Sequence, residues 1–419
     1  MSEKSREGLR GAVAVALIAT ATPGCGGESG VVARVSSGDH PAASRALRGR
    51  IVVGFDRAPG AAAIGRFAAK AGITPVRRVD ALALAVFDTP PGWTGRAALL
   101  TDPAVAFVEG DALEPEARPA PRSSVPVLPR LTAGDPGRTE QWYLDKIGAP
   151  RAWAGAGALA PVRVAVVDTG VDLSHPDLQG RLLPGYNLAS PGEPPQDFDG
   201  HGTATAGCIG AAAGNGIGIA GVAPNARIMP VKVGWSAATI AEALVWAADR
   251  ADLVSMSLSV KPASSEYPAA VETLRRAAGY VLARNVPLVC SMGNTGNESR
   301  NIPAAFAGAE LPELVAIGAT DAADRVAKFS TRGSWVTLAA PATSIYTLSK
   351  GGTYAWEHGT SFATPITAGV VALLLGRGFP RSPAAIKARL AATAADIDTP
   401  GFDAGSGAGR LDAARAVAY

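Results

Sequence analysis

The sequence predicts an α/β protein with a doubly wound, mostly parallel sheet flanked by helices, and three observations point to this fold class. Several short apolar segments show no alternation of polar and apolar residues, which is typical of strands buried on both faces of a parallel sheet. Helical stretches separate these segments, and this rhythm favours a doubly wound sheet. The chemically informative residues follow the strands, at the edge where such sheets bind ligands.

The expected strands and helices place this sheet in a large domain at residues 139–419. The strands are expected at 162–167, 228–233, 253–258, 286–291 and 314–317. The helices between them are expected at 202–213, 239–249 and 269–284.

A small α+β domain is expected ahead of it, at residues 48–112. Its strands at 51–55, 76–79, 82–87 and 105–108 alternate with helices at 61–71 and 93–100. The resulting order βαββαβ is that of a split-βαβ sandwich, self-contained but marginally stable at this size. Residues 113–138 are rich in Pro, Ala and Arg. We expect an extended, exposed linker there, which a protease would cut.

The composition excludes several classes of protein. With 47% hydrophobic and 18% charged residues in 419, the chain has enough apolar material for a sizeable core, which a disordered chain lacks. Lys and Arg exceed Asp and Glu by only three, and no basic block stands out, so no nucleic-acid partner is expected. The three cysteines form no CxxC pair, which argues against a disulfide scaffold and structural zinc.

Residues 1–30 have the pattern of a secretory signal peptide. Three basic residues precede the apolar run 11–22, and the uncharged stretch 11–27 is shorter than the roughly 20 residues that span a bilayer. Cys25, followed by a Gly/Ser stretch, resembles a bacterial lipoprotein cleavage site, although Thr22 stands where Leu is usual. Lipid anchoring, free secretion and an uncleaved hydrophobic tail all remain open.

Three segments of the large domain carry residues suited to nucleophilic catalysis. Asp168 ends an apolar strand, His201 stands between two glycines, and Ser361 lies at a glycine turn before an apolar helix. Acyl transfer by serine needs a base that takes its proton and a carboxylate that holds the imidazole tautomer. Each segment taken alone is more often a cap, a turn or a structural residue.

The chain from about residue 141 to residue 418 resembles the catalytic domain of the subtilisin-like serine peptidases, the subtilases of peptidase family S8. The matching stretches are VAVVDTGVDLSHPDL, DGHGTATAGCIG, GIAGVAP, a Gly-Asn pair at 293–294 and GTSFATP. The resemblance implies a serine endopeptidase with Ser361 as nucleophile, His201 as base and then acid, and Asp168 orienting the imidazole. It also implies that the amide of Asn294 binds the oxyanion.

The resemblance further implies how a polypeptide substrate binds. Substrate would add as a strand, its backbone pairing with a segment near Gly234 on one side and a second segment on the other. The implied substrate-binding residues are Ser257, Leu258, Ser259 and Gly293. The family usually has Gly where Ser259 stands and Asn where Ser255 stands, so the pocket mouth is expected to be narrower.

The small domain resembles the inhibitory propeptide of this family. The resemblance implies a self-processing zymogen, cut in the linker 113–138, whose propeptide then acts as an intramolecular inhibitor. We expect a secreted or cell-envelope monomer. Two other functions remain open: a non-catalytic binding module, and a peptide ligase or cyclase that uses the same acyl-enzyme.

Family members often bind structural calcium, and the resemblance implies a ligand set made of two carboxylates, an amide and backbone carbonyls: Asp135, Asp177, Ala213, Asn215, Ile217 and Ile219. Hard oxygen ligands of this kind suit Ca²⁺. An empty loop is the alternative. Cys208 and Cys290 are expected to be buried free thiols, with a disulfide as the alternative.

Overall fold

The computed structural model describes residues 49–113, 122–125, 134–260 and 271–419. The predicted signal peptide 1–30, with Cys25, lies outside the described residues. Within the described ranges, every helix is too short or too polar to cross a membrane.

The small domain is a four-stranded antiparallel sheet with two helices. Its elements are β1 (Arg50–Phe55), α2 (Ala61–Ala71), β2 (Thr74–Val79), the 3₁₀ helix η1 (Asp80–Leu82), β3 (Leu84–Asp88), α3 (Arg96–Leu99) and β4 (Val105–Gly110). The strands lie in the order β2-β3-β1-β4. The chain order of strands and helices is the predicted βαββαβ.

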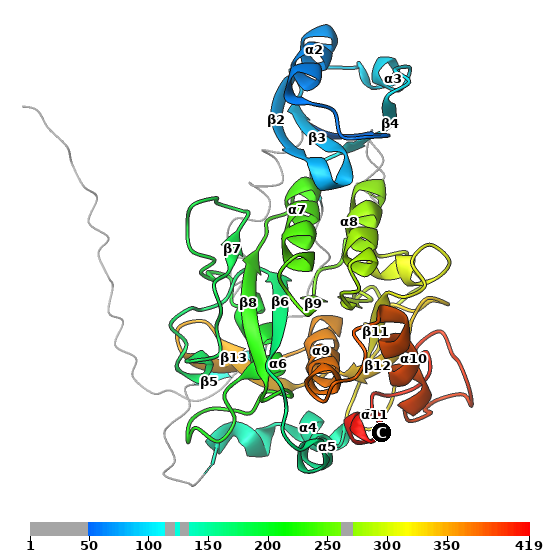
Figure 1. The fold of residues 1–419 in the computed structure, drawn as a ribbon. Coiled ribbons are helices and arrows are strands. Elements are labelled where there is room, and N and C mark those ends of the chain that lie inside the picture. The colour runs from blue at the N-terminus through cyan, green and yellow to red at the C-terminus, as the bar shows by residue number, and fades with distance from the viewer. Residues whose placement is uncertain (1–48, 114–121, 126–133, 261–270) are drawn as a thin grey trace, which may run out of the picture. The chain divides into compact units, whose positions relative to one another are not determined.

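The large domain is built on a seven-stranded parallel sheet in the order β12-β11-β10-β9-β6-β8-β7 (Figure 1). Its strands are β6 (Val162–Asp168), β7 (Tyr186–Asn187), β8 (Ala226–Lys232), β9 (Leu253–Met256), β10 (Leu288–Ser291), β11 (Val315–Thr320) and β12 (Leu338–Pro341). Its helices are α4 (Trp142–Lys146), α5 (Ala149–Ala156), α6 (His201–Gly210), α7 (Ala237–Ala248), α8 (Val271–Ala283), α9 (Thr360–Gly376), α10 (Pro383–Thr393) and α11 (Ala413–Val417), with 3₁₀ turns η2 (Pro136–Glu140), η3 (Pro176–Leu178) and η4 (Ala304–Ala307). The predicted fold class is confirmed for this domain.

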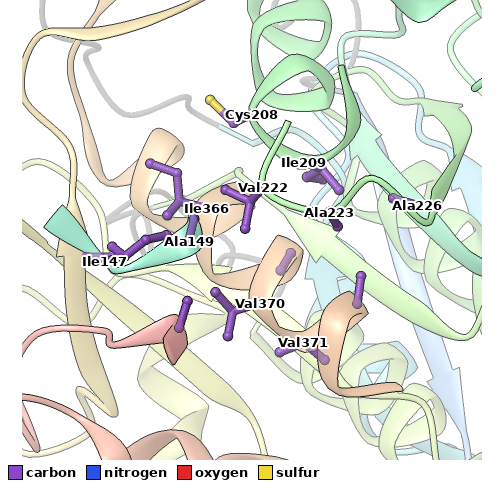
Figure 2. Packing of buried hydrophobic residues seen from close by; sticks show 14 of the residues in the cluster. Ile147, Ala149, Cys208, Ile209, Val222, Ala223, Ala226, Ile366, Val370 and Val371 are labelled. Atoms are coloured by element: carbon purple, nitrogen blue, oxygen red, sulfur yellow. The ribbon is translucent and has the colours of Figure 1, made fainter. Parts of the chain in front are cut away.

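Each face of the large sheet is covered by helices, which explains the uniformly apolar strands. Along β6, Val164 and Val166 belong to one core cluster and Ala165 and Val167 to the other, because successive side chains of a strand point to opposite faces. Helices α6 and α9 contribute to the first cluster, and α7 and α8 to the second. Figure 2 shows Ile366, Val370 and Val371 of α9 in the first cluster.

Helix α9 lies inside the protein, and its sequence is suited to that position. Sixteen of its seventeen residues are buried, and they are apolar or small on every side of the helix. Pro365 lies inside the helix as its sixth residue, beyond the first turn expected from the sequence, and its missing N–H removes one hydrogen bond within the helix.

The prediction of an extended, exposed linker at 113–138 is wrong near both ends of that segment, which are buried, while the described part in between is a strand. Leu113 is only 1% exposed, because it packs into the second core cluster. Strand β5 (Arg122–Val125) pairs with β14 (Thr353–Glu357), which forms a hairpin with β13 (Ile345–Ser349). Near the linker's end, η2 begins and Gly137 is buried.

Candidate active site

Strand β6 delivers the candidate acid, Asp168, to the carboxyl edge of the sheet. The residue is 1% exposed. Its Oδ1 lies 2.7 Å from Nδ1 of His201 and accepts a 2.7 Å hydrogen bond from the backbone N–H of Thr169. Its Oδ2 accepts a longer bond of 3.4 Å from the hydroxyl of Thr205. The carboxylate is therefore held by neighbours that fix its direction toward the imidazole.

The candidate base, His201, is the first residue of α6. Gly200 precedes it with a φ of +112°, a backbone conformation that favours glycine. The next residue must also be small, since a Cβ at Gly202 would lie 2.0 Å from the carbonyl oxygen of Gly170. The residue is 7% exposed, and its Nε2 has no hydrogen-bond partner among the described residues.

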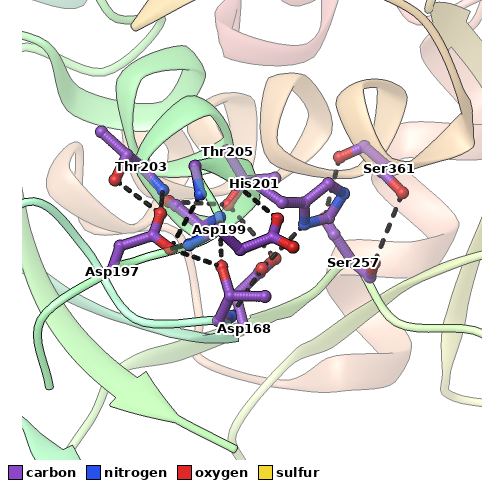
Figure 3. Close-up of polar contacts among 11 residues, drawn as sticks. Asp168, Asp197, Asp199, His201, Thr203, Thr205, Ser257 and Ser361 are labelled. Carbon is purple, nitrogen blue, oxygen red and sulfur yellow. Dashed lines mark hydrogen bonds and ion pairs between the residues drawn. The ribbon is translucent and has the colours of Figure 1, made fainter. Parts of the chain in front are cut away.

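The candidate nucleophile, Ser361, is the second residue of α9. It follows Gly359, whose φ is +130°, and lies at the positive end of a long helix. Its Oγ donates a long 3.4 Å hydrogen bond to the carbonyl of Ser257, whose own hydroxyl donates a 2.8 Å bond to the carbonyl of Ser361. Figure 3 shows the ring of His201 between Asp168 and Ser361.

Asn294, expected to bind the oxyanion, follows β10 at the same sheet edge. Its Oδ1 accepts hydrogen bonds from the backbone N–H of Thr360, at 2.9 Å, and from the Thr360 hydroxyl, at 3.1 Å. That hydroxyl accepts in turn from the N–H of Gly293. The amide oxygen of Asn294 is therefore anchored to Thr360, the residue before Ser361 at the start of α9.

Comparison with known proteins decides the family. Residues 160–409, more than half of the chain, match the model of the subtilase family, peptidase family S8. The chain belongs to the subtilase family. It is 37% identical over 292 residues to thermitase of Thermoactinomyces vulgaris, covering 67% of this chain and 97% of thermitase. It is 38% identical over 239 residues to subtilisin Savinase of Lederbergia lenta, covering 56% and 83% respectively.

Solved structures agree with this fold. Fervidolysin from Fervidobacterium pennivorans, a keratinolytic enzyme related to subtilisin, superimposes with a TM-score of 0.72 at 26% identity, over 88% of this chain and 60% of that one. The epidermin leader peptide processing serine protease of Staphylococcus aureus gives 0.69 at 19% identity, over 88% and 97%, and supports the fold alone. The protein is therefore a serine endopeptidase of the subtilase family.

The expected substrate-binding segment of this subtilase, Ser257, Leu258 and Ser259, follows β9 beside Ser361. Leu258 is 5% exposed and Ser259 9% exposed. The hydroxyls of Ser259 and Ser255 have no hydrogen-bond partner among the described residues. These are the two positions where Gly and Asn are usual in the family.

The opposite expected edge is paired with the end of the small domain. The N–H of Leu113 donates a 2.9 Å hydrogen bond to the carbonyl of Trp235, and Ala112 forms an antiparallel bridge with Ser236. The chain that leaves the small domain thus lies on the segment expected to bind substrate backbone.

Three of the six residues expected to bind calcium have side chains that meet at one loop. Asp135 accepts hydrogen bonds from the N–H groups of Gly214, at 2.8 Å, and Asn215, at 3.1 Å. Asp177 accepts from the Asn215 amide at 2.7 Å and from the N–H of Ile219 at 2.9 Å. Burial, with a smaller contribution from Asp135, raises the pKa of Asp177 to about 6.

The remaining three expected ligands, Ala213, Ile217 and Ile219, would contribute only backbone carbonyls from the same loop. The described residues contain no cluster of three or more His, Cys, Asp or Glu suited to a metal. A cation here would therefore depend on two carboxylates with amide and carbonyl oxygens.

Cys208 and Cys290 are buried free thiols, as expected. Burial raises the pKa of Cys208 to about 12 and raises that of Cys290 further above its ordinary range. Neither thiol is a nucleophile near neutral pH, because the reactive form is the thiolate.

Sequence reasoning missed one buried carboxylate beside the site. Asp197 is 2% exposed and hydrogen-bonds both to Thr169, next to the acid, and to Thr203, in the helix that carries the base. In the sequence, Asp197 is distinguished only by its position four residues before His201. No general rule of side-chain chemistry predicts a role for a residue at that position.

Proposed function

We propose that Asp168, His201 and Ser361 form the catalytic triad of this endopeptidase. The observation that carries the proposal is the 2.7 Å contact between Asp168 Oδ1 and His201 Nδ1, with Nε2 of the same ring left without a partner among the described residues. A carboxylate at Nδ1 holds the proton there, so that Nε2 is the basic nitrogen. The ring lies between the carboxylate and Ser361 (Figure 3).

The proposed reaction follows from these positions. His201 Nε2 takes the proton of the Ser361 hydroxyl as Oγ attacks the scissile carbonyl carbon. The negative oxygen that forms is stabilised by the Asn294 amide and the Ser361 N–H. The imidazolium then gives its proton to the leaving amine, and an ester remains on Ser361. Water attacks this ester by the same steps in reverse roles, which releases the acid and restores the hydroxyl.

A fluorophosphonate probe tests the triad, because it labels only an activated serine. We expect the parent protein to be labelled and Ser361→Ala, His201→Ala and Asp168→Ala to lose labelling and peptidase activity. Labelling that survives Ser361→Ala would exclude this nucleophile. A non-catalytic binding module predicts no labelling at all, and a ligase predicts transpeptidation products when an amine nucleophile is present.

We also propose that the small domain is an inhibitory propeptide of a zymogen. The support is its last residues, which pair with Trp235 and Ser236 on the expected substrate edge. Two carboxylates of the same segment hydrogen-bond to N–H groups at the starts of α7 and α8: Asp111 accepts from Ala238 and Glu109 accepts from Thr273. A bound propeptide of this kind excludes polypeptide substrates after the linker 113–138 is cut, until the propeptide is degraded.

Export is proposed on the sequence of residues 1–30, with the protein either secreted as a monomer or held at the cell envelope through a lipid on Cys25. The two outcomes differ in the fate of one residue. Mass analysis of the mature protein shows whether Cys25 carries a lipid. Cys25→Ala is the control: an anchored protein moves from the membrane fraction to the medium when Cys25 is replaced.

A structural calcium ion is proposed at the loop that carries Asn215. Asp135 and Asp177 direct carboxylates at this loop, and their mutual repulsion contributes to the raised pKa of Asp177. A bound divalent cation would neutralise that repulsion, and the oxygen-rich donor set suits Ca²⁺. The ion takes no part in the proposed chemistry.

A further inference from the structure

Asp197 accepts five hydrogen bonds, although the proposed reaction gives it no role. Its Oδ1 accepts from the hydroxyl of Thr169 at 3.0 Å and from the N–H groups of Asp199 and Gly200, both at 2.9 Å. Its Oδ2 accepts from the N–H of Thr203 at 2.9 Å and from the Thr203 hydroxyl at 2.7 Å. All five contacts are donors, which an aspartate carboxylate can satisfy and an amide cannot.

These bonds join the two segments that carry the acid and the base. Thr169 follows Asp168 directly, and its Oγ accepts a 2.9 Å bond from the N–H of Gly202, the residue after His201. Thr203 lies one residue further along α6. Asp197 and the Thr169 hydroxyl therefore form a bridge from the end of β6 to the first turn of α6. Figure 3 shows Asp197 beside Thr203.

Asp197 is itself fixed by the backbone. Its N–H donates a 3.1 Å bond to the carbonyl of Val171, and the N–H of Val171 donates to the carbonyl of Pro195 at 3.0 Å. The segment that carries Asp197 is thus paired, through a short parallel bridge between Val171 and Gln196, with the residues that follow β6. Both ends of the connection between β6 and α6 are held by main-chain hydrogen bonds.

We propose that Asp197 is a positioning residue for the reaction, which sets the contact between Asp168 and His201 by locking the start of α6 onto the end of β6. The inference rests on the proposed triad. Catalytic groups must be held close to their productive geometry, and a displacement of about 1 Å can cost about 10²-fold in rate. A bridge of five hydrogen bonds next to both groups supplies that restraint.

The first test is Asp197→Asn, with Asp172→Asn as the matched control. Asp172 is also a 2%-exposed aspartate that accepts several bonds, but it anchors Ser174 and the turn at Gly351 and Gly352. In Asp197→Asn the amide N–H groups face the donors of Thr203. We expect kcat to fall about 10- to 100-fold with KM changed less than about twofold, while the control keeps kcat within about threefold.

A second pair of variants keeps the proposal testable if Asp197→Asn does not fold. Thr169→Val keeps the shape of the side chain but removes the hydroxyl that links Asp197 to Gly202, and Thr169→Ser restores it. We expect a lower kcat for the valine variant and recovery in the serine variant. The downfield proton resonance of the His201 Nδ1–H, which reports its bond to Asp168, should weaken in Thr169→Val and in Asp197→Asn and persist in Asp172→Asn.

All rates are compared on processed protein counted by active-site titration. If Asp197→Asn and Thr169→Val keep the parent kcat and the downfield resonance while their thermal midpoints fall, Asp197 only supports the fold and the proposal is wrong. Failure of the triad looks different: Ser361→Ala or His201→Ala would then retain activity, whatever the result for Asp197.

Discussion

Two of the three sheets among the described residues, the seven-stranded sheet and the sheet of the small domain, bury their faces in different ways. The large sheet is covered on both faces mainly by helices of its own domain. The small sheet has one face against its own helices, with Val53 and Phe87 in a local cluster, whereas Val52 and Val86 belong to a cluster with residues of α7 and α8. The second face of the small sheet is therefore buried against the large domain.

The buried carboxylates show the same difference. In the large domain, Asp168 and Asp197 are satisfied by residues of that domain. In the small domain, Glu109 accepts from the N–H groups of Glu272 and Thr273, and Asp111 accepts from Ser236 and Ala238 across the interface. Side chains that cap the helices of another domain make docking specific, because helix N-terminal N–H groups otherwise lack partners.

The largest expected effect concerns the fate of the linker. We expect Ser361→Ala to accumulate as a precursor that keeps the small domain, whereas the parent loses it by cleavage within 113–138, because only the activated serine can cut its own linker. Mass spectrometry of both proteins from a protease-deficient host measures this. A Ser361→Ala protein that matures at the parent's rate would show that another peptidase does the cutting.

The next effect concerns the two caps. Replacing Glu109 and Asp111 together by Ala removes two helix caps, each worth about 0.5–2 kcal/mol. The affinity of the small domain for the mature enzyme should then fall about 5- to 1,000-fold. Inhibition constants measured in trans test this. Asp88→Ala is the control, since Asp88 pairs with Arg50 inside the small domain, and an equal loss in that variant would mean that the caps have no special role.

The sequence was sufficient to identify Asp168, His201 and Ser361 as candidates for the triad, because each lies in a contiguous motif at a strand end or helix start. It was not sufficient for β5, whose partner β14 follows more than 220 residues later and depends on how the chain folds back. The cap by Glu109 likewise exists only once two domains dock. Asp197 was missed because its five bonds reach across loops, and such convergence cannot be read from local spacing.

A smaller effect is expected from calcium removal. It tests how much of the stability of the large domain depends on a bound ion. A site filled at a hundredfold excess over Kd stabilises the folded state by about 2.7 kcal/mol. We therefore expect a chelator to lower the thermal midpoint of the mature enzyme by several degrees and to have less effect on Asp177→Asn. Differential scanning calorimetry with and without added Ca²⁺ measures it. If the thermal midpoint of the parent is the same with and without Ca²⁺, this loop binds no structural calcium.

The smallest effect is a pH dependence of docking. Burial raises the pKa of Glu109 and of Asp111 in the docked state, against the opposing effect of their hydrogen bonds. A higher pKa when docked means that docking takes up protons. These two groups therefore favour docking most below their ordinary pKa values near 4, and their contribution declines as the pH rises through the raised values.

We accordingly expect the small domain to dissociate more readily from the mature enzyme at pH 7 than at pH 4.5. Binding titrations against mature parent enzyme, inactivated at Ser361 with the fluorophosphonate probe, measure this without proteolysis. The variant with Glu109→Gln and Asp111→Asn should show a flatter pH dependence, because its amides do not titrate. If the pH dependence of this variant equals that of the parent, other groups control the release of the small domain. Glu109 and Asp111 would then differ from the buried carboxylates of the large domain only in having their hydrogen-bond partners in another domain.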